Sequence, residues 1–82
     1  MKNMKVLYFA QAAEAAGCRD EDWEISAPLS LQAFWTEAVR RHPKLAGLEP
    51  LCRIASGGEY VAGEGMLNPD REAAVIPPVS GG

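Results

Sequence analysis

Residues 30–41, SLQAFWTEAVRR, form the most clearly patterned segment of the chain. Ser30 has a side chain that can cap the first turn of a helix, and Pro43 is expected to end the helix just beyond the segment. Apolar residues recur at intervals of three and four and would line one helical face: Leu31, Phe34, Trp35, Ala38 and Val39. We therefore predict one amphipathic helix, with Phe34 and Trp35 packed in the core.

On the N-terminal side of this helix, the pattern predicts two strands and a shorter helix. Met4–Ala10 is dense in β-branched and aromatic residues, as in a buried strand. Gln11–Gly17 is rich in alanine and closes on a glycine, which is typical of a short helix with its C-terminal cap. The carboxylates of Asp20–Asp22 indicate a solvated loop. Trp23 and Ile25 then alternate with polar residues, which predicts a half-buried strand.

On the C-terminal side, short strands are separated by turn residues. Leu45, Leu48 and Leu51 punctuate a segment that we expect to be a loop fixed to the core. Gly57-Gly58 indicates a tight hairpin turn, and Gly63–Asp70 is expected to be a loop. The predicted strands are Cys52–Ala55, Glu59–Val61 and Glu72–Ile76.

This order of elements predicts an α+β fold of the β-grasp, ubiquitin-like type. In such a fold, a mixed sheet of about five strands packs on one main helix. The 82 residues suffice for one small domain, which we place at residues 1–77, and residues 78–82 are expected to form a flexible tail. We predict that the last strand is interior to the sheet, since only an anchored strand could direct the tail reproducibly.

The tail reads Pro78-Val79-Ser80-Gly81-Gly82 and is the candidate functional segment. Gly81 and Gly82 have no side chains, so the tip could enter a channel too narrow for other dipeptides. Pro77 and Pro78 lack amide protons and should end the preceding strand. The last four residues could extend about 13 Å. We expect Val79 and Ser80 to lie in a partner's channel, behind the terminal carboxylate.

The composition argues against several classes of partner. The net charge is −3 and the basic residues are scattered, so no nucleic-acid partner is expected. No apolar run is long enough to span a bilayer, so no membrane partner is expected. A stretch ending at Cys18 resembles a lipoprotein signal, but Gln11 and Glu14 interrupt it, which favours a cytoplasmic location.

The sequence offers no catalytic set, phosphate loop or metal motif. Cys18 and Cys52 are far apart, and His42 stands alone at an expected helix end. A zinc site would need more ligands than these three residues, so no bound metal or cofactor is predicted. Free cysteines are favoured, although spacing alone leaves a disulfide possible.

A bare carboxylate is a poor electrophile, so its chemistry would require another protein. A partner could convert it with ATP to an acyl-adenylate. Displacement by sulfur would then give a thiocarboxylate, and displacement by a lysine amine would give an isopeptide bond. The chain is therefore expected to be a carrier or substrate rather than an enzyme.

Three segments resemble the small subunit of molybdopterin synthase: Lys5–Gln11, Ala13–Gly17 and Ala74–Gly82. The resemblance implies a sulfur carrier whose Gly82 is adenylated by an E1-like enzyme and converted to a thiocarboxylate. It implies that the tail inserts into a large catalytic subunit, in a heterotetramer of two small and two large subunits. There it would give sulfur to cyclic pyranopterin monophosphate during molybdenum cofactor biosynthesis. Phe9 and Ile76 match apolar positions that this family uses against partners, although core packing would also explain them.

Two segments depart from this family's usual pattern. The family often has Asp-Gly-Asp-Glu-Val before its last strand, where this chain has Asn68–Val75, and Val-Asn in place of Ala55-Ser56. Three alternatives remain open. They are a sulfur carrier for thiamin thiazole synthesis, a ubiquitin-like modifier conjugated through Gly82, and an interaction module whose tail is incidental.

Overall fold

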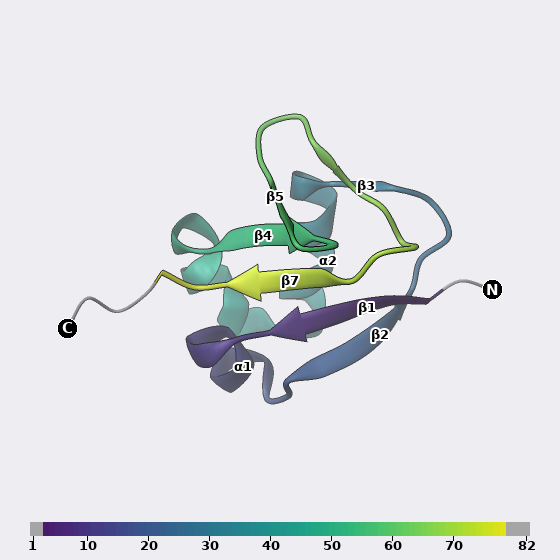
Figure 1. Cartoon of the computed structure of the whole chain (residues 1–82). Coiled ribbons are helices and arrows are strands. Elements are labelled where there is room, and N and C mark those ends of the chain that lie inside the picture. Colours follow the sequence, from purple (N-terminus) through teal and green to yellow (C-terminus); the bar gives the residue numbers. More distant parts are fainter. Residues whose placement is uncertain (1–2, 79–82) are drawn as a thin grey trace.

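The computed structural model describes residues 3–78, which form a curved sheet with helices on one side (Figure 1). The strands of the main sheet are β1 (Asn3–Tyr8), β2 (Asp20–Glu24), β4 (Arg53–Ser56), β5 (Glu59–Val61) and β7 (Ala73–Ile76). The helices are α1 (Ala10–Ala16), α2 (Leu31–Arg41) and the 3-10 helix η1 (Pro43–Leu51). A small second sheet joins β3 (Leu29–Ser30) to β6 (Met66–Leu67).

The main sheet is mixed and has the strand order β2-β1-β7-β4-β5. β1 and β7 are parallel, and the other neighbouring pairs are antiparallel. The predicted β-grasp fold is confirmed: one main helix, α2, packs against a five-stranded mixed sheet. The predicted interior position of the last strand is also confirmed, because β7 lies between β1 and β4.

The helix predicted from residues 30–41 is α2, and its apolar face lies in the core. The Ser30 hydroxyl caps it by accepting a hydrogen bond of 3.1 Å from the amide of Ala33. Phe34 and Trp35 are buried as predicted, and Phe34 stacks on Trp23 of β2 with ring centroids 4.9 Å apart. This aromatic contact joins the helix to the edge of the sheet.

The predicted loop at Asp20–Asp22 is wrong, because these residues belong to β2. They pair with β1 in an antiparallel register, in which Asp22 lies opposite Lys5. Side chains alternate along a strand, so the acids Asp20 and Asp22 face solvent while Trp23 is buried. Exposed acids are compatible with an edge strand because charge there discourages pairing with another sheet.

The loop predicted around Leu45, Leu48 and Leu51 is also wrong, because the segment forms η1. Leu45 is buried and Leu48 is half-buried, but Leu51 is 58% exposed where the chain enters β4. Within the expected loop at residues 63–70, two residues form β6. Among residues 3–78, no helix is both long and apolar enough to cross a membrane.

Candidate functional site

The strand that precedes the tail is fixed on both of its edges. In the register of the sheet, Val75 lies opposite Tyr8 of β1, and Ile76 lies opposite Arg53 of β4. The amide of Phe9 also donates a hydrogen bond of 3.2 Å to the carbonyl of Val75. The backbone is therefore held by neighbouring strands up to the last residue of β7.

Beyond β7, the described chain reaches the surface within two residues. Pro77 is buried and Pro78 is exposed, so the chain leaves the domain between them. Neither proline has an amide proton, so neither can extend the ladder, as the sequence predicted. Val79, Ser80, Gly81 and Gly82, which carry most of the tail predictions, lie outside the described residues.

An apolar surface surrounds the point where the tail begins. Phe9 follows β1 and is 48% exposed, and half-buried Ile76 ends the parallel neighbour β7, so the fold brings this predicted pair together. Leu51 comes two residues before Arg53, the partner of Ile76, and it is also exposed. We call Phe9, Leu51, Ile76 and Pro78 the tail-exit surface.

Sequence reasoning missed Leu51 because its spacing from Leu48 suggested that both residues pack inward. The position of Leu51 just before β4, the neighbour of β7, could have indicated that it lies near the start of the tail. The backbone makes an unusual turn directly after Phe9. There Ala10 has a φ of 48°, in the left-handed region that favours glycine. Exposed apolar side chains grouped at one place are typical of a surface that binds a protein.

Comparisons with known proteins cover nearly the whole chain. The ThiS family matches residues 6–82. The molybdopterin synthase sulfur carrier subunit of Homo sapiens is 40% identical over 82 residues, which covers 96% of this chain and 93% of that protein. The chain belongs to this sulfur carrier family. The corresponding subunit of Chlamydomonas reinhardtii is 33% identical over 81 residues, with 96% of this chain and 98% of that protein covered.

Solved structures of similar shape include other small proteins with this fold. SAMP1 from Haloferax volcanii has a TM-score of 0.80 and 26% identity, with 98% of this chain and 99% of that chain covered. A putative molybdopterin converting factor subunit 1 from Pyrococcus furiosus has a TM-score of 0.79 and 26% identity, with 96% and 100% covered. The ubiquitin-like fold of this sulfur carrier family member is therefore shared by several solved structures.

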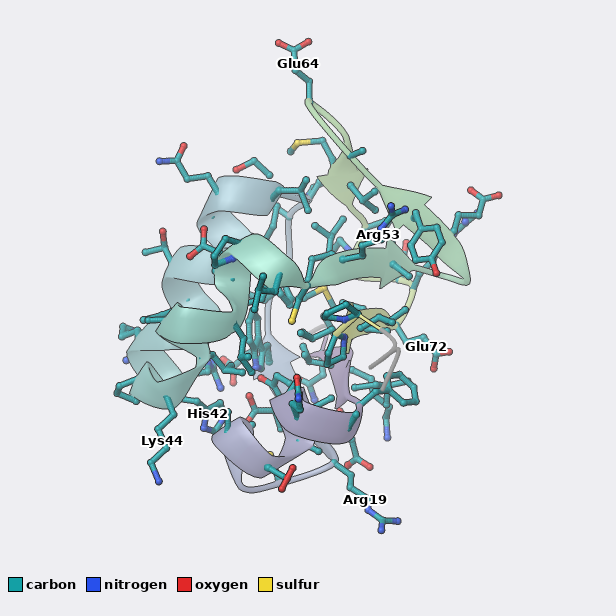
Figure 2. The ribbon with its side chains drawn as sticks, turned by 90° about the vertical axis from the view of Figure 1, so that its left-hand side faces the viewer. Arg19, His42, Lys44, Arg53, Glu64 and Glu72 are labelled. Carbon is teal, nitrogen blue, oxygen red and sulfur yellow. The ribbon has the colours of Figure 1, made fainter. Side chains whose placement is uncertain are left out.

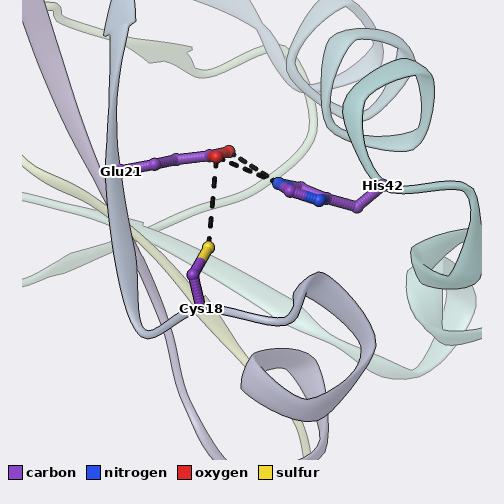
Figure 3. A group of neighbouring side chains, drawn as sticks. All are labelled: Cys18, Glu21 and His42. Carbon is purple, nitrogen blue, oxygen red and sulfur yellow. Dashed lines mark hydrogen bonds and ion pairs between the residues drawn. The ribbon is translucent and has the colours of Figure 1, made fainter.

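A second group of polar side chains in this sulfur carrier family member lies at β2 (Figure 3). Cys18, Glu21 and His42 place their ligand atoms within 4.8 Å of one another. His42 Nε2 lies 3.0 Å from both carboxylate oxygens of Glu21, and Cys18 Sγ lies 4.0 Å from Glu21 Oε1. The expectation that His42 stands alone is therefore wrong, because Glu21 was assigned to a solvated loop.

The carboxylate of Glu21 is held by the core as well as by His42. Its Oε2 atom accepts hydrogen bonds of 2.6 Å from the Tyr8 hydroxyl and 2.7 Å from Trp23 Nε1. Burial raises the pKa of Glu21, but the hydrogen bonds from Trp23, Tyr8 and His42 outweigh it and leave the pKa below its ordinary value. The group is therefore ionised at neutral pH.

The two cysteines lie in different surroundings, and both are free thiols, as the sequence favoured. Burial and the nearby carboxylates of Glu21 and Asp20 raise the pKa of Cys18. Burial alone raises the pKa of Cys52, which is not part of the group around Glu21. Among residues 3–78, Cys18, Glu21 and His42 are therefore candidates to hold a metal ion.

Proposed function

We propose that this chain carries sulfur as a thiocarboxylate on Gly82 and supplies it to molybdopterin synthase. Membership of the sulfur carrier family supports the role, and it extends across the tail because the family match reaches residue 82. The alternative in thiamin thiazole synthesis is less favoured, because the curated relatives matched over nearly the full chain are molybdopterin synthase subunits.

The structural observation that carries the proposal is the position of β7. The strand is central, its residues Ala73, Ala74 and Val75 are buried, and it is paired on both edges. A tail attached to such a strand starts from a fixed point, so its reach depends only on the residues beyond Pro78. Preorganised attachment lowers the entropy cost of delivering the tip into a partner.

The proposed chemistry takes place in partners rather than in this chain. An E1-like enzyme joins a Gly82 carboxylate oxygen to the α-phosphorus of ATP and releases pyrophosphate. Sulfide, as HS⁻, then attacks the carbonyl carbon and expels AMP, and loss of the proton from sulfur leaves the thiocarboxylate. Transfer of that sulfur to cyclic pyranopterin monophosphate, with water supplying the oxygen, returns the carboxylate to Gly82. The tail-carrying subunit is non-catalytic in this scheme.

The proposed partner for sulfur transfer is a large catalytic subunit, in a heterotetramer of two small and two large subunits. The tail-exit surface suits this role because it groups exposed apolar side chains beside the start of the tail. Docking of that surface would place residues 79–82 against the partner, and the slim glycines would allow the tip to enter a narrow channel.

The decisive experiment measures the intact mass of the full chain after incubation with an E1-like enzyme, ATP and a sulfur source. We expect one oxygen-to-sulfur exchange that maps to Gly82. Deletion of Gly82 should abolish the exchange. The matched control is Gly47→Ala, because no atom lies within 4 Å of a Cβ added there. Absence of the exchange with an active E1-like enzyme would overturn the proposal.

A second candidate function is that of a protein modifier attached to lysines through Gly82. The observation that favours it is the likeness to SAMP1, which is called a small archaeal modifier protein. Both functions would start from the acyl-adenylate. Tagging would produce a ladder of higher-mass adducts on many proteins, whereas a dedicated carrier should form one stable complex with the large subunit.

A further inference from the structure

We propose that Cys18, Glu21 and His42 form a zinc site with three protein ligands and one open position. The site shares no residue with the tail, and it needs neither Gly82 nor the sulfur carrier activity. Thiolate sulfur, carboxylate oxygen and imidazole nitrogen are the ligand atoms that Zn²⁺ takes in proteins. A set that mixes these three atom types favours this borderline-soft ion over Mg²⁺ or Ca²⁺, which prefer oxygen.

The geometry of the group already approaches that of a tetrahedral site. Ligand bonds of about 2.0–2.3 Å place the ligand atoms of tetrahedral zinc roughly 3.3–3.8 Å apart. Here Glu21 Oε1 lies 3.0 Å from His42 Nε2 and 4.0 Å from Cys18 Sγ, and all three atoms lie within 4.8 Å of one another. Shifts of about 1 Å or less, within reach of side-chain rotation, would therefore admit the ion.

The two oxygens of Glu21 have different surroundings, which supports the assignment. Oε2 accepts hydrogen bonds from the Tyr8 hydroxyl and Trp23 Nε1, whereas Oε1 is the oxygen nearest Cys18 Sγ, and His42 Nε2 lies 3.0 Å from both oxygens. Metal-binding carboxylates in proteins are commonly held in this way by hydrogen bonds to the atom that does not bind the ion. Tyr8 and Trp23 are buried, so they fix the direction of the carboxylate.

The position of the group in the fold also favours a cation. Cys18 follows α1, Glu21 lies in β2 and His42 is the C-terminal cap of α2, so an ion would join three segments. The C-terminus of a helix carries partial negative charge that stabilises a nearby cation. The side chains of His42 and Glu21 retain 18% and 21% exposure, which leaves the fourth position open to water or a partner's group.

Binding of Zn²⁺ would replace the proton on the sulfur atom of Cys18. The thiol of Cys18 must lose its proton to bind Zn²⁺, so one proton per ion is released to solvent from this residue. His42 must present a lone pair at Nε2, so any proton on that atom moves to Nδ1 or leaves. In the metal-free protein, hydrogen bonds hold Cys18 and His42 against Glu21 instead. A zinc titration distinguishes the metal-bound from the metal-free state.

The test is a titration of the full, untagged and reduced chain with zinc against a chromophoric chelator. We expect one ion per chain and a loss of affinity of at least roughly 100-fold in Cys18→Ser, since a direct ligand matters more than the outer partners, whose loss costs 10–100-fold. Cys52→Ser is the matched control and should bind like the parent chain, because Cys52 is the other half-buried free cysteine. Equal affinity in the two variants would overturn the proposal.

Two further measurements keep the proposal testable if Cys18→Ser fails to fold. Cobalt added to the parent chain should give the absorption bands of a tetrahedral site with a thiolate ligand, and their absence would overturn the assignment. Zinc at about 100-fold above its Kd adds about 2.7 kcal/mol and should raise the Tm of the parent chain by about 11–22 °C. Tyr8→Phe should lower the zinc affinity roughly tenfold without loss of the cobalt bands. Unchanged affinity would contradict the inference that the Tyr8 hydroxyl orients Glu21 for the ion.

Discussion

β7 lies in the middle of the five-stranded sheet, whereas β2 lies at its edge. β7 consists of apolar residues and is paired to β1 and β4 through its backbone. β2 pairs only with β1, carries four acids and Trp23, and reaches the end of α2 through the contact of Glu21 with His42. The start of the tail is thus fixed by the backbone ladder, while the edge strand also depends on polar side chains.

The tail-exit surface at the end of β7 and the polar group at β2 also consist of different residues. Figure 2 looks onto the end of the sheet from which the tail leaves, with Arg53 on one side and His42 on another. The polar group of Cys18, Glu21 and His42 shares no residue with the tail-exit surface. Variants in one region should leave the other intact, and this separation makes the comparison testable.

The largest effect is expected from a charge in the central strand. Val75→Asp should destabilise the domain by about 4 kcal/mol or more, because Val75 is fully buried and the new carboxylate would have no partner there. The measurement is urea unfolding followed by tryptophan fluorescence.

The control for this variant changes a charge in the edge strand. Asp22→Ala removes an exposed acid from β2 and should shift stability by no more than about 0.5 kcal/mol. Comparable losses in Val75→Asp and Asp22→Ala would contradict the contrast between the two strands.

A smaller effect is expected from removing one hydroxyl at the polar group. Tyr8→Phe takes a hydrogen bond away from the ionised Glu21 and should cost about 1.5–3 kcal/mol of unfolding free energy. Tyr60→Phe is the matched control, because Tyr60 is 62% exposed, and it should cost less than about 0.5 kcal/mol. If the two tyrosine variants are equally stable, the polar group does not hold the edge strand.

The tail-exit surface should affect binding and not folding. Phe9→Ala or Leu51→Ala should weaken binding to the proposed large subunit about tenfold, which corresponds to about 1.4 kcal/mol. Stability should change little, because both side chains are about half exposed or more.

Met66→Ala is the matched control for these binding variants. Met66 is 52% exposed but belongs to the small sheet formed by β3 and β6. Calorimetric titration of each variant against the large subunit would measure the difference. Loss of affinity in Met66→Ala as large as in Phe9→Ala would place the docking surface elsewhere.

The smallest effect is expected at low pH, in the stability that the ion pairs of Glu37 on α2 give to the fold. Hydrogen bonds from Arg40 and then Arg41 lower the pKa of Glu37 to about 2, and Arg41 also lies over the Trp23 ring, 5.0 Å from its centroid. A lowered pKa means that the ion pair stabilises the fold at neutral pH and that this gain is lost as the pH falls toward about 2. The gain should be below about 1 kcal/mol, because Arg40, whose hydrogen bond lowers the pKa of Glu37 most, has a side chain that is 68% exposed.

Glu37→Gln tests this prediction. The variant should melt slightly below the parent chain at neutral pH, and the gap should close near the pKa of about 2. Thermal melts across that pH range would measure the gap. A difference in Tm that stays constant with pH would show that ionisation of Glu37 does not contribute to the stability of the fold.

The sequence predicted the elements whose pattern is local. The spacing of Phe34, Trp35 and Ala38 predicted α2, and the alanine-rich segment that closes on Gly17 predicted α1. The central position of β7 followed from the requirement that the tail be anchored, and the structure agrees. Such local patterns are informative because helix and strand periods are fixed by backbone geometry.

The parts that escaped prediction depend on contacts between distant residues. Glu21 meets Tyr8 and His42, which are 13 and 21 positions away, so no motif spacing could join them. A run of three acids suggested a loop, although in β2 their side chains alternate between solvent and the face that carries Tyr8 and His42. Leu51 follows Leu48 at a helical interval, yet it is exposed because the chain turns there into β4.

The parallel pairing of β1 with β7 has a consequence for how the protein is made. Val6 pairs with Ala73, so the centre of the sheet joins the two ends of the described chain. During synthesis, β1 emerges before β7 and must wait for it before the sheet can close. Contacts so distant in sequence also slow folding. A ribosome-bound fragment without β7 therefore lacks the central strand of the sheet, and the domain can close only after residues 73–76 have left the ribosome.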